Sequence, residues 1–328
     1  MTVQVPDSSK PGMDDDFNPA EHLQLFKTSQ PALAGLLGDP KLIVLAQQYK
    51  RHDEVAVAAQ KLFKSTMWRA NLAVLVATVT GALMMATQIG TESYSSIVSS
   101  FGAISGIAAI AGSMWLFRAR EGNLLESWMH SRAKAEGNRA DYFKNLADMP
   151  GTPEQLLQQF DYCGAYQLDH QCAYFSKRAA ESRKSGERTL RWGGYAVALS
   201  SFSGVGGSVL GFTGNNSWLS VGALSVIGGA LGAFANAYES MNQDRRNAAR
   251  YEAGLEALEL IKSRSGETRL AVATGNADAL KAFVAAVNEQ LSLQTKQWLE
   301  AEQGVKSSMA SLDAALKNPT SKDSKKGT

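Results

Sequence analysis

Residues 192–238 read WGGYAVALSSFSGVGGSVLGFTGNNSWLSVGALSVIGGALGAFANAY and contain no lysine, arginine, aspartate or glutamate. This charge-free run of 47 residues is about twice as long as the ~20 apolar residues that a helix needs to cross a hydrocarbon core. Its middle, residues 213–217, carries Gly and Asn, which favour turns. The run therefore predicts two membrane-spanning helices, at about 192–212 and 218–238, joined by a tight turn.

Two shorter charge-free runs precede it, residues 70–91 and 93–117, and only Glu92 separates them. Each is one span long, so they predict a first hairpin with spans at about 70–89 and 97–117. The predicted fold class is all-α: a four-helix transmembrane bundle built from two hairpins, with long cytoplasmic helical extensions. A soluble core with very apolar helices is the alternative, but surface helices of soluble proteins keep a polar face.

The overall composition conceals this pattern. The chain has 328 residues, of which 45% are hydrophobic and 20% charged, and its formal net charge is +2. Its mean hydropathy of -0.18 averages apolar spans with long polar segments. This composition excludes a disordered chain and a disulfide scaffold, and the small net charge argues against a nucleic-acid partner.

Basic residues predict the orientation. They cluster at the span ends that are remote from the two hairpin turns, and neither turn contains Lys or Arg. Because basic residues are enriched on the cytoplasmic side, we expect both termini and the central connection to be cytoplasmic. The flanking residues on which this rests are Arg69, Arg118, Arg120, Arg191, Arg245 and Arg246.

Small residues crowd the predicted spans. Glycines four residues apart share a helix face and let two backbones approach closely. These faces either pack the helices within one bundle or line an oligomeric pore, and the sequence leaves both interpretations open. The candidate positions are Gly102, Gly106, Gly207, Gly211, Gly228, Gly232, Ser200 and Ser203.

Heptad patterns extend from the spans into the cytoplasmic segments. A helix start at Asp39-Pro40 leads into a first apolar seam, a second follows residue 124, and a third begins after Asn276. Gly186 and Gly266 are expected to interrupt or end helices. The seam residues are Leu42, Leu45, Tyr49 and Phe63, then Trp128 with Arg132 and Arg139, then Leu280, Val287, Leu291 and Trp298.

The order of these elements predicts four parts and an internal repeat. Residues 1–38 are expected to be polar and largely disordered with a short helix, and residues 304–328 to form a flexible tail. Residues 39–150 and 151–303 each contain a cytoplasmic helix, a two-span hairpin and a returning helix.

The chain resembles the SLATT group of bacterial two-transmembrane proteins and chains that carry the DUF4231 domain. The resemblance covers about residues 40–302, as two units in tandem. It rests on the segment 58–63, the short-looped hairpin, the stretch 128–136, and the C-terminal block from Arg245 to Trp298. It implies a bacterial inner-membrane effector of a defence or conflict system that oligomerises, perturbs the membrane as a pore, and responds to a cytoplasmic nucleotide-signalling partner.

Motifs of catalysis were sought and not found. Cys163 and Cys172 are nine residues apart, which matches no zinc pattern, and the chain has no P-loop or GxSxG motif. We therefore expect no enzymatic activity, no cofactor and no metal. The alternatives to an oligomeric effector in the lipid bilayer are a membrane scaffold that docks cytoplasmic partners through its helical seams, and a channel or transporter for small solutes.

Overall fold

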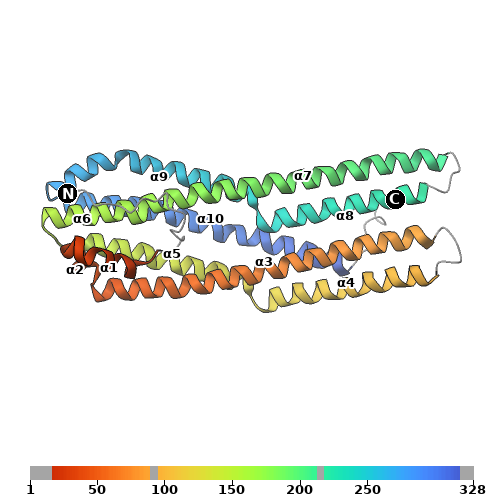
Figure 1. The fold of residues 1–328 in the computed structure, drawn as a ribbon, viewed down its shortest axis with the longest axis horizontal. Helices are drawn as coiled ribbons and strands as arrows, with labels where there is room; N and C mark the ends of the chain where they lie inside the picture. Colours follow the sequence, from red (N-terminus) through yellow and green to blue (C-terminus); the bar gives the residue numbers. More distant parts are fainter. Residues whose placement is uncertain (1–16, 89–94, 213–217, 318–328) are drawn as a thin grey trace, which may run out of the picture. The chain divides into compact units, whose positions relative to one another are not determined.

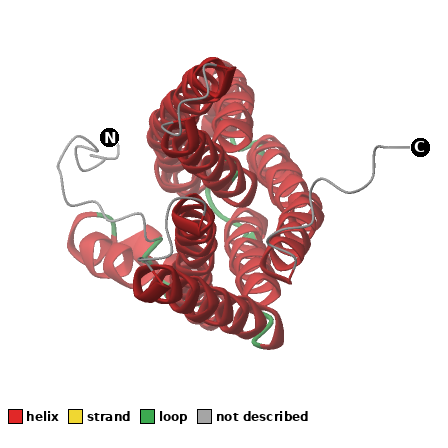
Figure 2. Cartoon of the chain, turned by 90° about the vertical axis from the view of Figure 1, so that its right-hand side faces the viewer, coloured by secondary structure: helices red, strands yellow, loops and turns green. Residues whose placement is uncertain are grey.

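The computed structural model describes residues 17–88, 95–212 and 218–317, and every regular element within them is a helix (Figures 1 and 2). The predicted all-α class is thereby confirmed. The elements are α1 (Pro19–Ser29), α2 (Pro31–Leu37), α3 (Pro40–Gln88), α4 (Ser95–Glu121), α5 (Leu124–Asp148), α6 (Pro153–Cys163), the π-helix η2 (Gly164–Asp169), α7 (His170–Phe212), α8 (Trp218–Asn242), α9 (Asp244–Ala273) and α10 (Ala277–Lys317).

The helices form two compact units that cut across the tandem repeat. Unit 1 comprises Met1–Ala59, Glu126–Ser182 and Arg246–Glu300. Unit 2 comprises Gln60–Leu125, Arg183–Arg245 and Ala301–Thr328. The long helices α3, α7 and α10 contribute residues to both, so each half of the sequence repeat supplies part of each unit.

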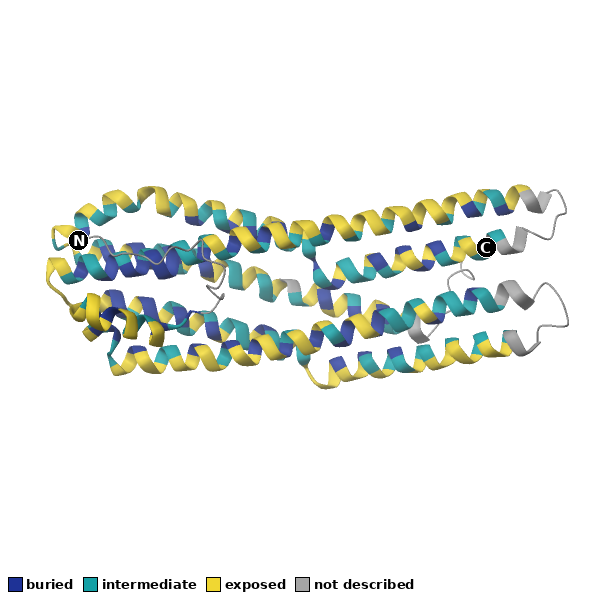
Figure 3. Cartoon of the chain, in the orientation of Figure 1, coloured by how far each residue is buried: buried dark blue, intermediate teal, exposed yellow. Residues whose placement is uncertain are grey.

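Unit 1 has a large apolar core, which appears as dark blue ribbon in Figure 3. Most of the predicted seam residues lie in or against it, whereas Phe63 is buried in unit 2 and Trp128 contacts the ring of Trp298. Leu42, Tyr49, Leu280 and Val287 are almost fully buried, and Trp298 packs on the same core. The heptad periodicity thus identified faces that pack within the chain.

The N-terminal segment is more ordered than the sequence predicts. Residues 1–16 lie outside the described residues, but Phe17 and the helices α1 and α2 belong to unit 1. Phe26, Leu33 and Leu37 are buried in its core. The polar residues are concentrated in residues 1–16, whereas residues 17–37 are rich in Phe, Leu and Ala, some of which are buried by the two short helices.

The C-terminal tail is also a correction. α10 continues to Lys317, so residues 304–317 are helical. Val305, Met309 and Leu312, spaced by four and three residues, are each 5% exposed within unit 2. Asp313 of the same segment pairs with Arg120 at 3.0 Å. The apolar spacing places these side chains on one helix face, and burial of that face stabilises the helix.

Two glycines that were expected to break helices do not. α7 runs through Gly186, and α9 continues past Gly266 to Ala273. A glycine inside a helix costs only about 1 kcal/mol relative to alanine, which tertiary packing offsets. At Gly186 a Cβ would lie 2.7 Å from Cγ of Arg245, so this glycine permits a close approach. α9 is followed instead by Gly275, whose φ is +93°.

The start of α6 shows a capping box and allows a first prediction. Thr152 Oγ1 accepts a hydrogen bond from the backbone N–H of Gln155 at 3.3 Å, and the Gln155 side chain accepts one from the backbone N–H of Thr152. Thr152→Ala should lower the free energy of unfolding by about 1 kcal/mol, measured by thermal unfolding. Ser292→Ala is the control, because that hydroxyl bonds a carbonyl of its own helix and caps nothing; an equal loss in both variants would contradict the assignment.

Unit 2 contains the segments predicted to span a membrane. The described residues of the four predicted spans lie within helices α3, α4, α7 and α8, and the two predicted turns fall largely on residues 89–94 and 213–217, outside the described residues. Two of the described helical segments, Pro40–Met84 and Val98–Asp148, are long and apolar enough to cross a membrane. The described residues of α7 and α8 do not form a further segment of this kind.

Candidate functional site

Helices α4 and α7 of unit 2 each expose many residues, which are coloured yellow in Figure 3, and many of them are large and apolar. In the most apolar part of the second membrane-length segment, which includes α4, only 11% of residues are buried. The exposed large side chains of α4 are Ile104, Ile107, Ile110, Met114 and Phe117; those of α7 include Trp192, Tyr195, Leu199, Phe202, Val205 and Val209. On each helix, exposed large apolar side chains in this number indicate contact with a membrane or another protein.

Aromatic side chains accompany the basic residues at one end of this surface. The guanidinium carbon of Arg69 lies 4.7 Å from the ring centroid of Trp115, a cation–π contact between α3 and α4. Trp68 and Trp192 are 49% and 67% exposed. Aromatic and basic residues are enriched together at membrane interfaces, so this end has the composition of an interfacial band.

The two helices of the second hairpin, α7 and α8, approach each other closely at a glycine. A Cβ on Gly228 of α8 would lie 2.6 Å from the backbone N of Ser200 and 2.9 Å from the backbone O of Ala196, both on α7. Ser200 Oγ donates to the carbonyl of Ser225 at 2.9 Å, and Ser225 Oγ donates back to the carbonyl of Ser200 at 3.0 Å. Small residues and hydroxyl groups therefore allow the two helices to touch backbone to backbone.

The first hairpin repeats part of this contact. Ser105 Oγ of α4 donates to the carbonyl of Ala77 at 2.9 Å, and a Cβ on Gly81 would lie 3.6 Å from that hydroxyl. In the second hairpin, a Cβ on Gly204 would likewise lie 3.4 Å from the hydroxyl oxygen of Ser225. In each hairpin, a serine of the second helix thus donates a hydrogen bond to a backbone carbonyl of the first helix. A glycine follows the accepting residue by four positions.

The same equivalence extends to the end of each hairpin. Ser105 and Ser225 each lie 18 residues before a non-glycine residue with positive φ, Asn123 (44°) and Gln243 (52°). Asn123 lies between α4 and α5, and Gln243 lies between α8 and α9. Neither serine was among the residues predicted from the sequence. Their equal spacing from Asn123 and Gln243 is the sequence feature that could have identified them.

The predicted small residues have different surroundings. Gly102 lies against Met84, whose sulfur would be 3.2 Å from a Cβ, and Gly232 faces Ala196. Gly207 and Ser203 are buried in unit 2. Gly106 is exposed, with no atom within 4 Å of a Cβ. Gly211 is helical, but its surroundings lie outside the described part of the chain.

The flanking arginines also differ. Arg120 pairs with Asp313, and Arg245 pairs with Glu239 at 3.4 Å. Arg118, Arg191 and Arg246 are exposed.

Unit 1 contains a buried charge network on the second seam. Arg132 of α5 pairs with Asp53 of α3 at 2.6 Å and with Glu136 at 2.8 Å. Arg139, only 5% exposed, pairs with the other oxygen of Glu136 at 2.5 Å. Burial alone would raise the pKa of Glu136, but Arg139 and Arg132 outweigh it and hold that pKa below its ordinary value. The two arginines that interrupt the apolar pattern are thus matched by acids.

A cluster of aromatic rings surrounds His22. Its Nδ1 lies 2.9 Å from the hydroxyl of Tyr162, and its ring centroid lies 3.9 Å from that of Tyr166. Burial, and then the nearby charge of His170, lower the pKa of His22 to about 4. His22 is therefore neutral at physiological pH and packs α1 onto the core.

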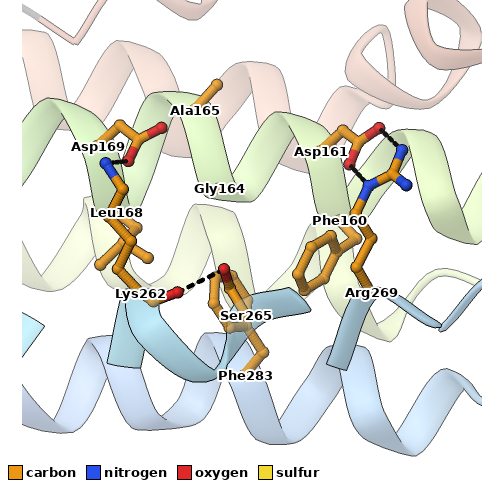
Figure 4. Close-up of a pocket in the computed structure, with 10 residues that line it drawn as sticks. All are labelled: Phe160, Asp161, Gly164, Ala165, Leu168, Asp169, Lys262, Ser265, Arg269 and Phe283. Atoms are coloured by element: carbon orange, nitrogen blue, oxygen red, sulfur yellow. Dashed lines mark hydrogen bonds and ion pairs between the residues drawn. The ribbon is translucent and has the colours of Figure 1, made fainter. Parts of the chain in front are cut away.

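A cleft of about 220 Å³ lies beside the π-helix η2 (Figure 4). Its rim has two ion pairs, Lys262 with Asp169 at 2.7 Å and Arg269 with Asp161 at 2.8 and 2.9 Å. Both cations are already neutralised, so the cleft offers no free charge to a ligand. Its lining is Phe160, Asp161, Gly164, Ala165, Leu168, Asp169, Lys262, Ser265, Arg269 and Phe283.

The cysteines have the environment of structural residues. Cys163 is fully buried and burial raises its pKa, while burial raises the pKa of Cys172 to about 11. Both thiols are therefore protonated at neutral pH. In the described ranges no group of three His, Cys, Asp or Glu side chains is arranged to hold a metal ion.

No family model, curated protein sequence or solved structure is significantly similar to the chain.

Proposed function

We propose that the chain is an integral membrane protein with four spans, in which unit 2 lies in the bilayer and unit 1 in the cytoplasm. The observation that carries this proposal is the exposed apolar surface of α4 and α7, bordered by aromatic and basic side chains. α4 has 27 residues and is about 40 Å long at 1.5 Å per residue, which exceeds the ~30 Å of a hydrocarbon core. Lipid is the solvent in which such side chains are stable without a protein partner.

The activity we propose is membrane perturbation. Several copies of the chain would assemble in a bacterial inner membrane and open a pore when unit 1 receives a signal, without catalysis. Two features support it: the serine- and glycine-rich spans, and the resemblance to two-transmembrane effectors. The scaffold alternative has less support, because most of the seam residues that would dock partners are buried by packing within the chain.

Cysteine labelling tests the topology. Single cysteines at Glu92, Asn216 and Lys296 are introduced into a chain in which Cys163 and Cys172 are alanine, and intact spheroplasts are treated with a membrane-impermeant maleimide. Labelling is expected at Glu92→Cys and Asn216→Cys from outside, and at Lys296→Cys only after lysis. Labelling of Lys296→Cys in intact spheroplasts, or of neither turn, would contradict the proposed topology.

Liposome leakage tests the activity. Purified protein is reconstituted into liposomes that hold a small fluorophore and a large dextran, and cyclic dinucleotides and cyclic oligoadenylates are added in turn. Release of the fluorophore with retention of the dextran is expected for a pore. Release of both indicates rupture, and no release under any of these conditions opposes the proposed activity while leaving the topology to be judged by labelling.

A further inference from the structure

A basic face of unit 2 lies on α7, just before the apolar part of that helix. Lys184, Arg188 and Arg191 are spaced by four and three residues, so they share one side of the helix. All three are exposed. Tyr195 follows four residues after Arg191 and continues the same side.

These three cations have no carboxylate partner among the described residues. Glu187, which is also exposed, forms no ion pair with them. The contrast with Arg120 and Arg245, which are each paired with an acid, is direct. Unpaired cations at an exposed helix face are positioned to bind an anion from outside the chain.

An apolar ridge continues from the basic face. Trp192 and Tyr195 are each 67% exposed, and their rings meet edge to face with centroids 6.2 Å apart. Phe202, two turns further on, is 80% exposed. From Arg188 to Phe202 the helix rises about 21 Å at 1.5 Å per residue, which matches a phosphate group together with one leaflet's acyl chain.

We propose that this face of α7 binds the head group of an anionic phospholipid, such as phosphatidylglycerol, through Lys184, Arg188 and Arg191, while its acyl chains lie along Trp192, Tyr195 and Phe202. The inference rests on the proposed membrane placement of unit 2. A guanidinium group suits a phosphate diester because its donors match two oxygens at once. A lipid is the occupant because the cations and the exposed apolar ridge are continuous on one helix.

The test measures lipid binding by the full-length protein in non-ionic detergent micelles. Dioleoylphosphatidylglycerol or dioleoylphosphatidylcholine is titrated into the micelles, and native mass spectrometry counts the lipids that remain bound. The variant is Arg188→Gln combined with Arg191→Gln. The matched control is Arg264→Gln combined with Lys296→Gln, two exposed cations of unit 1 whose removal changes the net charge equally.

We expect the wild-type protein to prefer phosphatidylglycerol, and the α7 double variant to lose about 25-fold in affinity for it, near fivefold per cation. Phosphatidylcholine binding should be unchanged, and the control should remain within twofold of the wild type. Arg188→Lys with Arg191→Lys should keep most of the preference, which shows that the face still folds.

Three results would overturn the proposal. They are equal binding of the two lipids by the wild type, an equal loss in the unit 1 control, and full competition by 10 mM inorganic phosphate, which would make the face a site for a free anion. Failure of the membrane placement itself is distinguishable, because the protein would then bind neither lipid.

Discussion

Replacing Glu136 with glutamine is expected to lower the free energy of unfolding of unit 1 by about 3–5 kcal/mol, the typical cost of leaving one side of a buried ion pair without its partner. Glu136 is the shared acid of two arginines, with N–O distances of 2.8 Å to Arg132 and 2.5 Å to Arg139. Its removal leaves Arg139, which is 5% exposed, as a buried cation without its acid. Thermal and urea unfolding followed by circular dichroism measure the loss.

Glu181→Gln is the matched control for this change. Glu181 also pairs with an arginine on its own helix, Arg178 at 2.9 Å, but the two side chains are 50% and 40% exposed. An exposed pair of this kind contributes about 0–1 kcal/mol. Equal effects of the two substitutions would mean that the network at Glu136 is solvated.

The same network determines a pH dependence. The pKa of Glu136 is lower in the folded chain than in the unfolded chain, so its contribution to stability is present above the unfolded pKa of about 4.3. That contribution is lost as the pH falls from there through the lower folded pKa. The wild type should therefore lose more stability than Glu136→Gln below about pH 4.3, and parallel curves would refute this.

Gly228→Ala is the second change with a large expected effect, a loss of about 1–3 kcal/mol in the stability of the second hairpin. The added Cβ would be 2.6 Å from a backbone nitrogen and 2.9 Å from a backbone oxygen of α7. Backbone atoms of a helix cannot move aside as the end of a side chain can, so α7 and α8 must separate. Separation also lengthens both hydrogen bonds between Ser200 and Ser225.

The adjacent residue provides the control. At Gly229 the nearest atom to a new Cβ is the Ser200 hydroxyl at 3.9 Å, an ordinary contact. Gly229→Ala should be neutral or slightly stabilising, because alanine is the better helix former. Thermal unfolding in detergent, followed by tryptophan fluorescence, compares the two variants. Similar midpoints would show that Gly228 is not at a close approach of the helices.

Periodicity predicted much of the fold. The charge-free runs fall largely on helices α3, α4, α7 and α8, and two of the described segments are long and apolar enough to cross a membrane. The heptad spacing identified Leu42, Tyr49 and Val287 as inward-facing. Such patterns succeed because a helix repeats every 3.6 residues and because burial selects apolar side chains.

Contacts between distant residues were not predictable in this way. Arg132 and Arg139 weakened the second seam in the sequence, yet they are neutralised by Asp53, which is 79 residues from Arg132, and by Glu136. Gly228 and Gly229 are alike in sequence, and only one of them touches α7. The sequence of α8 alone cannot distinguish Gly228 from Gly229, because the position of α7 determines which of them lies at the close contact.

The division of unit 1 into three chain segments has a consequence for synthesis. Its last segment, Arg246–Glu300, leaves the ribosome only after both hairpins have been made. Leu280 and Val287, which are completely buried in the finished core, are therefore missing while the two hairpins are being synthesised. At that stage the core of unit 1 lacks the side chains of its third segment. Unit 1 can therefore complete its folding only after Arg246–Glu300 has been synthesised.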